Sequence, residues 1–185
     1  MYQPGDREPA PGVIALVQDF LNTTDIEVGR EDLADTTGLI AFCEAHGLPL
    51  RDFTPGDLAA LLDLRELLRD VCQAHAGVDV PPDRLAELTR VLDRAHLVLR
   101  VDAHGDTDIG PAPGLGDLEA LTAALATAVT KAAAEGTWRR LKACAMHSCR
   151  WVYYDASRSG RSRWCTMSIC GSRAKMRAYR KRTAS

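Results

Sequence analysis

Residues 144–182 read CAMHSCRWVYYDASRSGRSRWCTMSICGSRAKMRAYRKR, and this stretch decides the fold of the C-terminal part of the chain. It contains two cysteine pairs, Cys144 with Cys149 and Cys165 with Cys170. Two short pairs separated by a loop are typical of four thiolates that hold one tetrahedral Zn²⁺. A segment this short, with so few aliphatic residues, cannot form a stable core alone. We therefore predict one structural zinc ion bound by these four cysteines.

Three other residues compete for a metal or thiol role. His147 lies between Cys144 and Cys149, but four thiolates already complete the shell, so we expect His147 to lie outside it. A shell of four protein ligands leaves no position for a catalytic water molecule. Cys43 and Cys72 fall on apolar helix faces and are predicted to be core thiols. The alternative, a reduced small domain without metal, would leave the segment with nothing to hold its shape.

The spacer between the cysteine pairs predicts a β-hairpin with its turn at Ser159 and Gly160, which would return Cys165 to the neighbourhood of Cys149. The basic residues after Gly171 predict a C-terminal helix. Cys170 would then lie at the helix N-terminus, where the helix dipole favours a thiolate. A hairpin followed by a helix that carries the last ligand predicts a treble-clef-like zinc finger.

Charge is divided unequally along the chain. Residues 139–185 contain 13 Lys and Arg against one acid, a net charge of +12, whereas residues 1–138 contain 10 Lys and Arg against 24 Asp and Glu, a net charge of −14. Such asymmetry predicts a basic unit that binds a polyanion, and double-stranded DNA is the expected partner. The alternative is a solvated basic tail that only complements the acidic part.

The predicted C-terminal helix orders these cations. Arg173, Arg177, Arg180 and Lys181 fall at i, i+4, i+7 and i+8 and form one stripe. The candidate DNA contacts, which include three arginines near the predicted hairpin turn, are Arg158, Arg161, Arg163, Arg173, Lys175, Arg177, Arg180 and Lys181. The small and apolar residues left to pack on the hairpin are Ala174, Met176, Ala178 and Tyr179.

The acidic part predicts a helix-rich α+β domain over residues 1–136, with the finger at 137–185. Apolar periodicity and capping residues predict helices at 13–24, 36–47, 54–77, 81–95 and 116–136, and alternation at 96–111 predicts a small antiparallel hairpin. Thr36 or Thr37 is the expected N-cap of the second helix, and Thr54 that of the third. The Pro-rich first dozen residues are expected to be loosely attached.

The first helix has an apolar stripe at Val13, Leu16, Val17, Phe20 and Leu21. Asp19 and Asn22 lie beside this stripe, and Arg65 lies on the central helix. These three residues are a candidate pocket for a small-molecule effector. The preferred interpretation is a structural network, in which Asp19 pairs with Arg65 and Asn22 caps its own helix. A third interpretation is a homodimer surface.

Several classes of protein are disfavoured. No apolar run reaches the length of a transmembrane helix, and the polar N-terminus lacks the apolar core of a secretory signal, so we expect a cytoplasmic protein with no membrane partner. The chain contains no nucleophile elbow, P-loop, dinucleotide fingerprint or HExxH motif, so we expect no enzyme. The alternative function is a zinc-stabilised protein-interaction module.

Residues 144–182 resemble the CGNR zinc finger, whose pattern is roughly C-x4-C-x-W-x-F/Y-x-D-x-S, then R-x-C-x4-C-G-N-R-x-K. Matching positions beyond the cysteines are Trp151, Asp155, Ser157, Trp164 and Lys175. The signature departs at Ser172, where the family has Asn. Both residues are small polar caps, so the fold is expected to persist, whereas a contact made by that Asn is in doubt.

The segments LVQDFLNT (16–23), DLADTTGLIAFCEAHGL (32–48) and LDLRELLRDV (62–71) resemble the domain that usually precedes this finger, called ABATE and described as a stress-induced transcription regulator. The resemblance covers most of the chain and is strongest in the finger. It implies a bacterial DNA-binding regulator with an α+β N-terminal domain.

Overall fold

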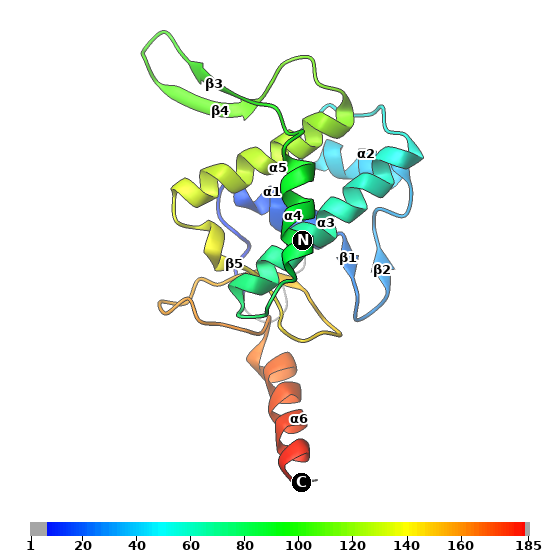
Figure 1. Ribbon diagram of the computed structural model, residues 1–185, viewed down its shortest axis with the longest axis vertical. Coiled ribbons are helices and arrows are strands. Elements are labelled where there is room, and N and C mark those ends of the chain that lie inside the picture. Colours follow the sequence, from blue (N-terminus) through cyan, green and yellow to red (C-terminus); the bar gives the residue numbers. More distant parts are fainter. Residues whose placement is uncertain (1–6, 184–185) are drawn as a thin grey trace.

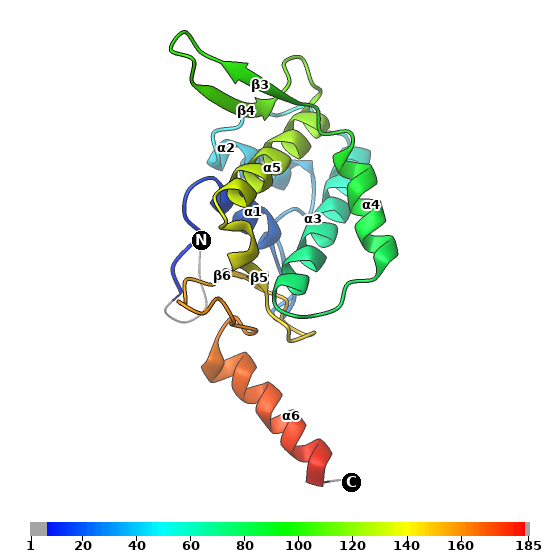
Figure 2. The same cartoon turned by 60° about the vertical axis from the view of Figure 1, so that its left-hand side comes forward.

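The computed structural model describes residues 7–183 of the 185-residue chain. Most of its helices form one body, and the last helix, α6 (Ser172–Thr183), projects from one end of that body (Figures 1 and 2). The body contains α1 (Ile14–Leu21), α2 (Thr36–Ala45), α3 (Pro55–His75), α4 (Pro82–Leu92) and α5 (Asp117–Ala134). Helices with small antiparallel hairpins confirm the predicted α+β class. Across residues 7–183, no helix is both long and apolar enough to cross a membrane.

Three two-stranded antiparallel sheets accompany the described helices. They pair β1 (Thr24–Asp25) with β2 (Arg30–Glu31), β3 (Leu97–Val101) with β4 (Thr107–Pro111), and β5 (Leu141–Ala143) with β6 (Val152–Tyr154). The β3–β4 hairpin confirms the alternation at 96–111. The β1–β2 pair escaped sequence reasoning, because strands of two residues are too short to show any period.

The central helix α3 forms where its caps predict. Thr54 and Asp57 make a capping box, in which Asp57 N–H donates to Thr54 Oγ1 at 3.2 Å and Thr54 N–H donates to Asp57 Oδ2 at 2.8 Å. The helix ends before Gly77, whose φ of +77° lies in the left-handed region that favours glycine. Leucines on its inner face belong to the main core, so α3 is the element against which the rest of the body packs.

The first helix begins one residue later than its apolar stripe suggests. Val13 is the N-cap and is 44% exposed, whereas Ile14 is 1% exposed. The buried face is therefore Ile14, Val17, Phe20 and Leu21. The expected inclusion of Val13 in the buried face was wrong, since Val13 is exposed at the helix N-terminus although its backbone angles are helical.

The N-cap of α2 is Asp35, not Thr36 or Thr37. The Asp35 carboxylate accepts a hydrogen bond from Gly38 N–H at 3.0 Å, and both threonines lie inside the first turn. Adjacent residues in the run DTT are all acceptable caps, so the choice among them depends on the direction from which the chain enters.

The main core extends across the predicted boundary between residues 136 and 137. Leu141, Ala143 and Val152, from β5 and β6, pack in the same cluster as the leucines of α1 and α3. His75 on α3 donates from Nδ1 to the Leu141 carbonyl at 2.8 Å. The boundary stays a prediction, but its two sides share one core.

Candidate metal centre and nucleic-acid interface

The four cysteines of the two pairs come together at the base of α6. Their Sγ atoms all lie within 4.8 Å of one another, and all four residues are buried. The Sγ atoms of Cys149 and Cys165 are 3.7 Å apart, and those of Cys165 and Cys170 are 3.6 Å apart. Zinc–sulfur bonds of about 2.3 Å in a tetrahedron place the sulfurs about 3.8 Å apart, so the cluster fits one structural zinc ion.

The four thiols are also ligands that Zn²⁺ prefers. Hydrogen bonding from Cys149 and Cys165 lowers the pKa of the Cys144 thiol, the same hydrogen bonds raise the pKa of Cys149 and Cys165, and burial raises the pKa of Cys170. A divalent cation at the centre would favour the thiolates instead, because a coordinated thiol is deprotonated outright.

The remaining histidine and thiol candidates behave as expected. His147 is exposed and lies outside the cluster. Cys43 and Cys72 are buried in the main core, where burial raises their pKa to about 11 and about 12. Thiols with such high pKa values are inert core residues.

A tight turn after β5 sets the first cysteine pair. The N–H of Cys144 donates to the Trp151 carbonyl at 2.9 Å, and the N–H groups of Cys149 and Arg150 donate to the Met146 carbonyl at 2.9 and 3.1 Å. Arg150 closes this turn with φ of +53°, which is uncommon for a residue with a side chain. We call residues 144–151 the knuckle.

The predicted hairpin between the cysteine pairs was wrong. β6 pairs with β5, which precedes the first cysteine pair, and residues 155–164 form an irregular loop. The alternation in the spacer identified a strand but not the strand that pairs with it. The pairing depends on which neighbouring strand has an edge free for hydrogen bonding in the folded protein. The loop nevertheless delivers Cys165 to the knuckle, as the Ala145 N–H donates to the Arg163 carbonyl at 2.9 Å.

A buried ion pair organises this loop. Asp155 and Lys142 have side chains 0% and 4% exposed, and Lys142 Nζ donates to Asp155 Oδ2 at 2.9 Å. The hydroxyls of Ser157 and Ser162 donate to Asp155 Oδ1 at 2.7 and 2.9 Å. Burial alone raises the pKa of Asp155, but these hydrogen bonds from Ser157, Lys142 and Ser162 outweigh it and hold the pKa well below its usual range. Sequence reasoning missed Lys142, although a lysine two residues from a cysteine in an apolar strand was the available signal.

Arg7, near the N-terminus, binds the backbone at the first cysteine of the second pair. Arg7 donates from Nε to the Cys165 carbonyl at 2.5 Å and from Nη2 to the Trp164 carbonyl at 3.0 Å. Its guanidinium also lies 4.1 Å from the centre of the Tyr153 ring, in cation–π contact. Within the described residues, the expectation of a loose N-terminus is therefore wrong from Arg7 onward; residues 1–6 lie outside the described range.

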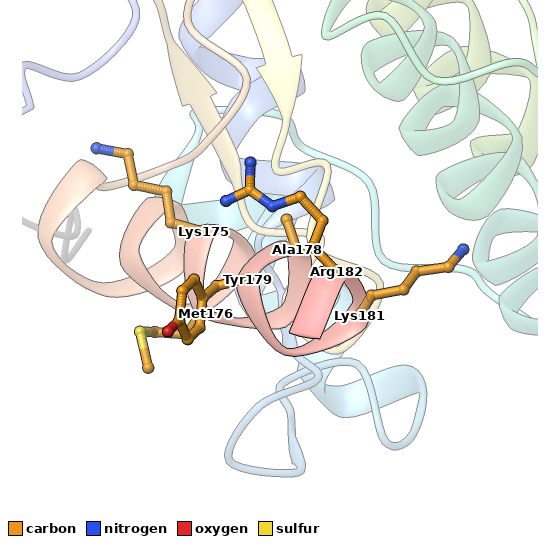
Figure 3. Close-up of a pocket in the computed structure, with 6 residues that line it drawn as sticks. All are labelled: Lys175, Met176, Ala178, Tyr179, Lys181 and Arg182. Carbon is orange, nitrogen blue, oxygen red and sulfur yellow. The ribbon is translucent and has the colours of Figure 1, made fainter. Parts of the chain in front are cut away.

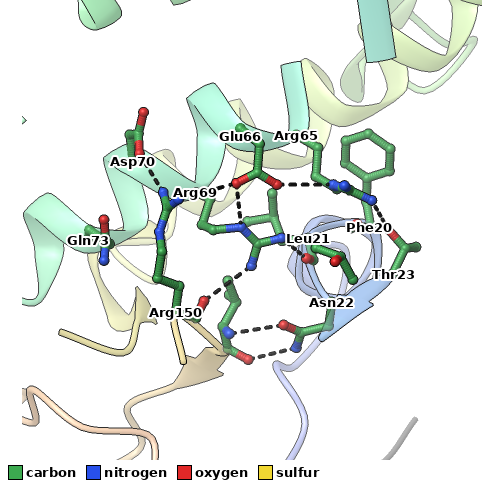
Figure 4. A network of polar contacts seen from close by, with 12 residues as sticks. Phe20, Leu21, Asn22, Thr23, Arg65, Glu66, Arg69, Asp70, Gln73 and Arg150 are labelled. Carbon is green, nitrogen blue, oxygen red and sulfur yellow. Dashed lines mark hydrogen bonds and ion pairs between the residues drawn. The ribbon is translucent and has the colours of Figure 1, made fainter. Parts of the chain in front are cut away.

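Figure 4 shows a charged network that joins α3 to the knuckle. Arg69 donates to Glu66 Oε2 at 3.0 Å and to the Arg150 carbonyl at 3.1 Å. Arg150 in turn donates to Asp70 Oδ1 at 2.6 Å. Asp70 also accepts from Arg84 of α4 at 2.9 Å, so the knuckle is connected through α3 to α4.

The three candidate pocket residues each have other partners. Asp19 pairs with His46 at 3.1 Å, so the expected Asp19–Arg65 pair was wrong. Arg65 instead binds both carboxylate oxygens of Glu31 at 2.7 Å. Asp19, Asn22 and Arg65 thus each contact a different partner. The effector pocket stays a prediction.

Asn22 has a role that sequence reasoning missed. Its side-chain amide donates to the Val152 carbonyl at 2.7 Å, and its side-chain oxygen accepts from the Val152 N–H at 2.9 Å. Asn22 therefore satisfies the backbone hydrogen-bonding groups of Val152 in β6, and this contact connects the finger to the end of α1. Asn22 is also the C-cap residue of α1, as expected, but it caps the helix through its backbone N–H, which donates to the Gln18 carbonyl at 3.0 Å.

At the start of α6, the backbone of Gly171 lies close to the side chain of Met167. Cys170 lies in a π-helical turn, η2 (Met167–Gly171), which leads directly into α6. A Cβ on Gly171 would collide with the Met167 sulfur, so any other residue would force the Met167 side chain to move aside. The Ser172 hydroxyl donates to the Met167 carbonyl at 3.2 Å, which gives this departure from the family signature a structural role.

The expected packing of the apolar residues of α6 holds only for Ala174, which is partly buried against the cluster that contains the four cysteines, Trp151 and Tyr153. None of the helix residues is buried, and Met176 and Tyr179 are 52% and 56% exposed. The helix points away from the body in both views, so no hairpin lies beneath it (Figures 1 and 2). Figure 3 shows the side chains spread around its surface.

The candidate DNA contacts differ in their surroundings. Arg173 forms an ion pair with Glu27, at 2.6 Å, in the loop between β1 and β2. Arg163 donates to the Ala76 carbonyl at 3.2 Å and so faces the end of α3. Arg158 and Arg161 are exposed on the loop 155–164, and the remaining cations of α6 are exposed along the helix. Their contacts with DNA stay predictions.

Comparison with known families finds two matches. The model of the CGNR zinc finger matches residues 140–183. The model named ABATE, with the description putative stress-induced transcription regulator, matches residues 15–146. The curated proteins contain no match to the chain. Neither family description is that of an enzyme.

Proposed function

Because this chain belongs to the ABATE family and carries a CGNR zinc finger, we propose that it regulates transcription by binding double-stranded DNA through α6. The observation that carries the proposal is α6 itself. Within Ser172–Thr183 there are six Lys and Arg residues and no acid, and none of the residues is buried. An exposed helix whose only charged residues are cations is suited to the phosphate backbones of a duplex.

The zinc site supports this function by giving the helix a fixed origin. Cys170 lies one residue before the glycine that leads into α6, so the metal that binds Cys170 would hold the first turn of the helix. When bound, zinc supplies structural cross-linking and no catalysis. The body supplies the knuckle and its network, which hold the first cysteine pair.

The proposal is tested by fluorescence anisotropy of a labelled DNA duplex titrated with the protein at several salt concentrations. We expect log K to fall linearly with log salt, with a slope of about −0.9 for each phosphate contacted. Replacement of Arg180 and Arg182 by Ala should reduce the magnitude of this slope by about 2.

The matched control removes equal charge elsewhere. Arg90 and Arg94 are exposed residues on and just beyond α4, in the body, and their replacement by Ala should leave the slope unchanged. If both double variants weaken DNA binding equally, the net charge of the protein rather than the position of the cations on α6 determines the affinity. Binding that is indifferent to salt would contradict the proposal.

A zinc-stabilised protein-interaction module is the second candidate function. The exposed apolar side chains near the zinc site favour it, namely Met167, Ile169, Met176 and Tyr179. Salt-indifferent binding to a protein partner, with no affinity for duplex DNA, would select this alternative.

A further inference from the structure

Two neighbouring residues of α6 depart from its charged character. Met176 and Tyr179 are three residues apart, so their side chains lie on one face of the helix. Figure 3 shows the two side chains together, and both are more than half exposed. We call this pair the ridge. Apolar side chains that a fold leaves side by side in solvent mark a contact surface when their surroundings are polar.

Cations lie on both sides of the ridge. At about 100° per residue, Arg173 and Arg180 lie on one side of it, and Lys175 and Arg182 lie on the other, each row roughly 90° away around the helix axis. The first of these cations, Arg173, is held near the body by Glu27. Beyond Arg173 the apolar line therefore lies between Arg180 on one side and Lys175 and Arg182 on the other.

We propose that the ridge faces the base edges in a major groove, while the two cationic rows contact the phosphates of opposite strands. This inference rests on the proposed binding of DNA by α6. A major groove about 12 Å wide admits a helix with its side chains. The thymine C5-methyl group is the apolar feature of that groove, and apolar side chains recognise it. The ridge thus supplies a preference for thymine, and the cations supply affinity.

A protein groove fits this surface less well. Helices that dock in protein grooves present apolar anchors at i, i+3, i+4 and i+7, whereas α6 offers one i, i+3 pair between cations. Two side chains also bury far less than the roughly 1,000 Å² that a specific protein interface needs. Positive charge on both sides of a narrow apolar line instead matches a duplex, whose two backbones are both anionic.

The experiment selects duplexes from a library with a randomised core. It compares the wild-type protein with a ridge variant, Met176→Ala with Tyr179→Ala, and with a matched cation variant, Lys175→Ala with Arg182→Ala. None of these four residues is buried, so each variant should keep its zinc content and circular dichroism. Affinity for the selected duplex and its salt slope are then measured for each protein.

We expect the wild-type protein to select a motif that contains thymine. The ridge variant should lose about tenfold in affinity for this motif with an unchanged salt slope. The cation variant should weaken binding to all duplexes and reduce the magnitude of the slope by about 2, with the motif retained. Substitution of uracil for thymine should weaken wild-type binding and leave the ridge variant unaffected.

Two results would overturn the inference while leaving the proposed function intact. One is a ridge variant that selects the same motif with wild-type affinity, and the other is wild-type binding that ignores the loss of the thymine methyl group. If the wild-type protein binds no duplex in a salt-dependent way, the proposed function itself fails, and the inference fails with it.

Discussion

At the scale of single residues, the finger depends on polar side chains that bind backbone more than on its few apolar ones. Arg7 and Asn22 each hold main-chain groups of the finger from distant parts of the chain. Lys142 and Asp155 do the same for the loop 155–164, and their charges are removed from water almost completely. A buried pair of this kind is strongly destabilised when one partner is removed, because the other charge is left without compensation.

The change Asp155→Asn should therefore lower the free energy of unfolding by about 3–5 kcal/mol, because Lys142 keeps a buried charge without a carboxylate. Urea denaturation at neutral pH measures this. The lowered pKa of Asp155 means that its contribution is present above the ordinary carboxyl pKa and is lost only as pH falls through the lower folded-state value.

The control is the double change Lys142→Met with Asp155→Leu, which removes both charges and should cost less than the single change. A loss below about 1 kcal/mol for Asp155→Asn would contradict a buried charge pair.

At the scale of elements, α6 differs from every helix of the body. The body helices α1 to α5 each bury at least one residue, whereas α6 buries none and packs on the zinc-site cluster only through Ala174, so packing contributes little to its stability. Isolated helices of about a dozen residues are marginal in water. The N-terminal end of α6 is therefore held by the turn η2, by the close packing of Gly171 against Met167, and by the metal that Cys170 binds.

Removal of zinc by a chelator should lower the helical circular dichroism by the share of α6 and leave the body folded, because the helix loses its anchored first turn. DNA affinity should fall with it, and added zinc should restore both. The variant Cys170→Ser should resemble the chelated protein, and His147→Ala, at an exposed residue outside the cluster, should resemble the wild type. An unchanged helical signal in metal-free protein would count against this account.

At the scale of the whole molecule, the finger and the helical body share one hydrophobic core and one network of charged side chains. β5 and β6 complete the main core, and the network of Glu66, Arg69, Asp70 and Arg150 joins α3 to the knuckle. A zinc site normally lets a small segment fold alone. In this protein one wall of the finger comes from the body.

The fragment 137–185 with one equivalent of zinc should therefore bind the metal yet remain poorly ordered outside the cluster, because it lacks the core that covers Leu141 and Val152. Two-dimensional NMR of the backbone amides should show narrow dispersion for the fragment, against wide dispersion of the same residues in the full chain. Wide dispersion in the zinc-bound fragment would establish the finger as an independent unit.

The sequence by itself determined what depends on neighbours along the chain. The capping box of α3, the glycines that end helices and the β3–β4 alternation are local patterns, and the four cysteines are a chemical set that a single metal recruits. These were sufficient for the α+β class, the zinc centre and the basic character of α6.

Only the tertiary structure decided which distant groups meet. The contacts of Arg7 and Asn22 join residues far apart in sequence. The strand that pairs with β6 and the carboxylate that pairs with Lys142 are nearer along the chain, but the local pattern does not distinguish them from other strand edges and carboxylates. The direction of α6 was decided in the same way. Its composition shows that it is cationic, but whether Met176 and Tyr179 are covered depends on what lies beside the helix, and the fold places nothing there.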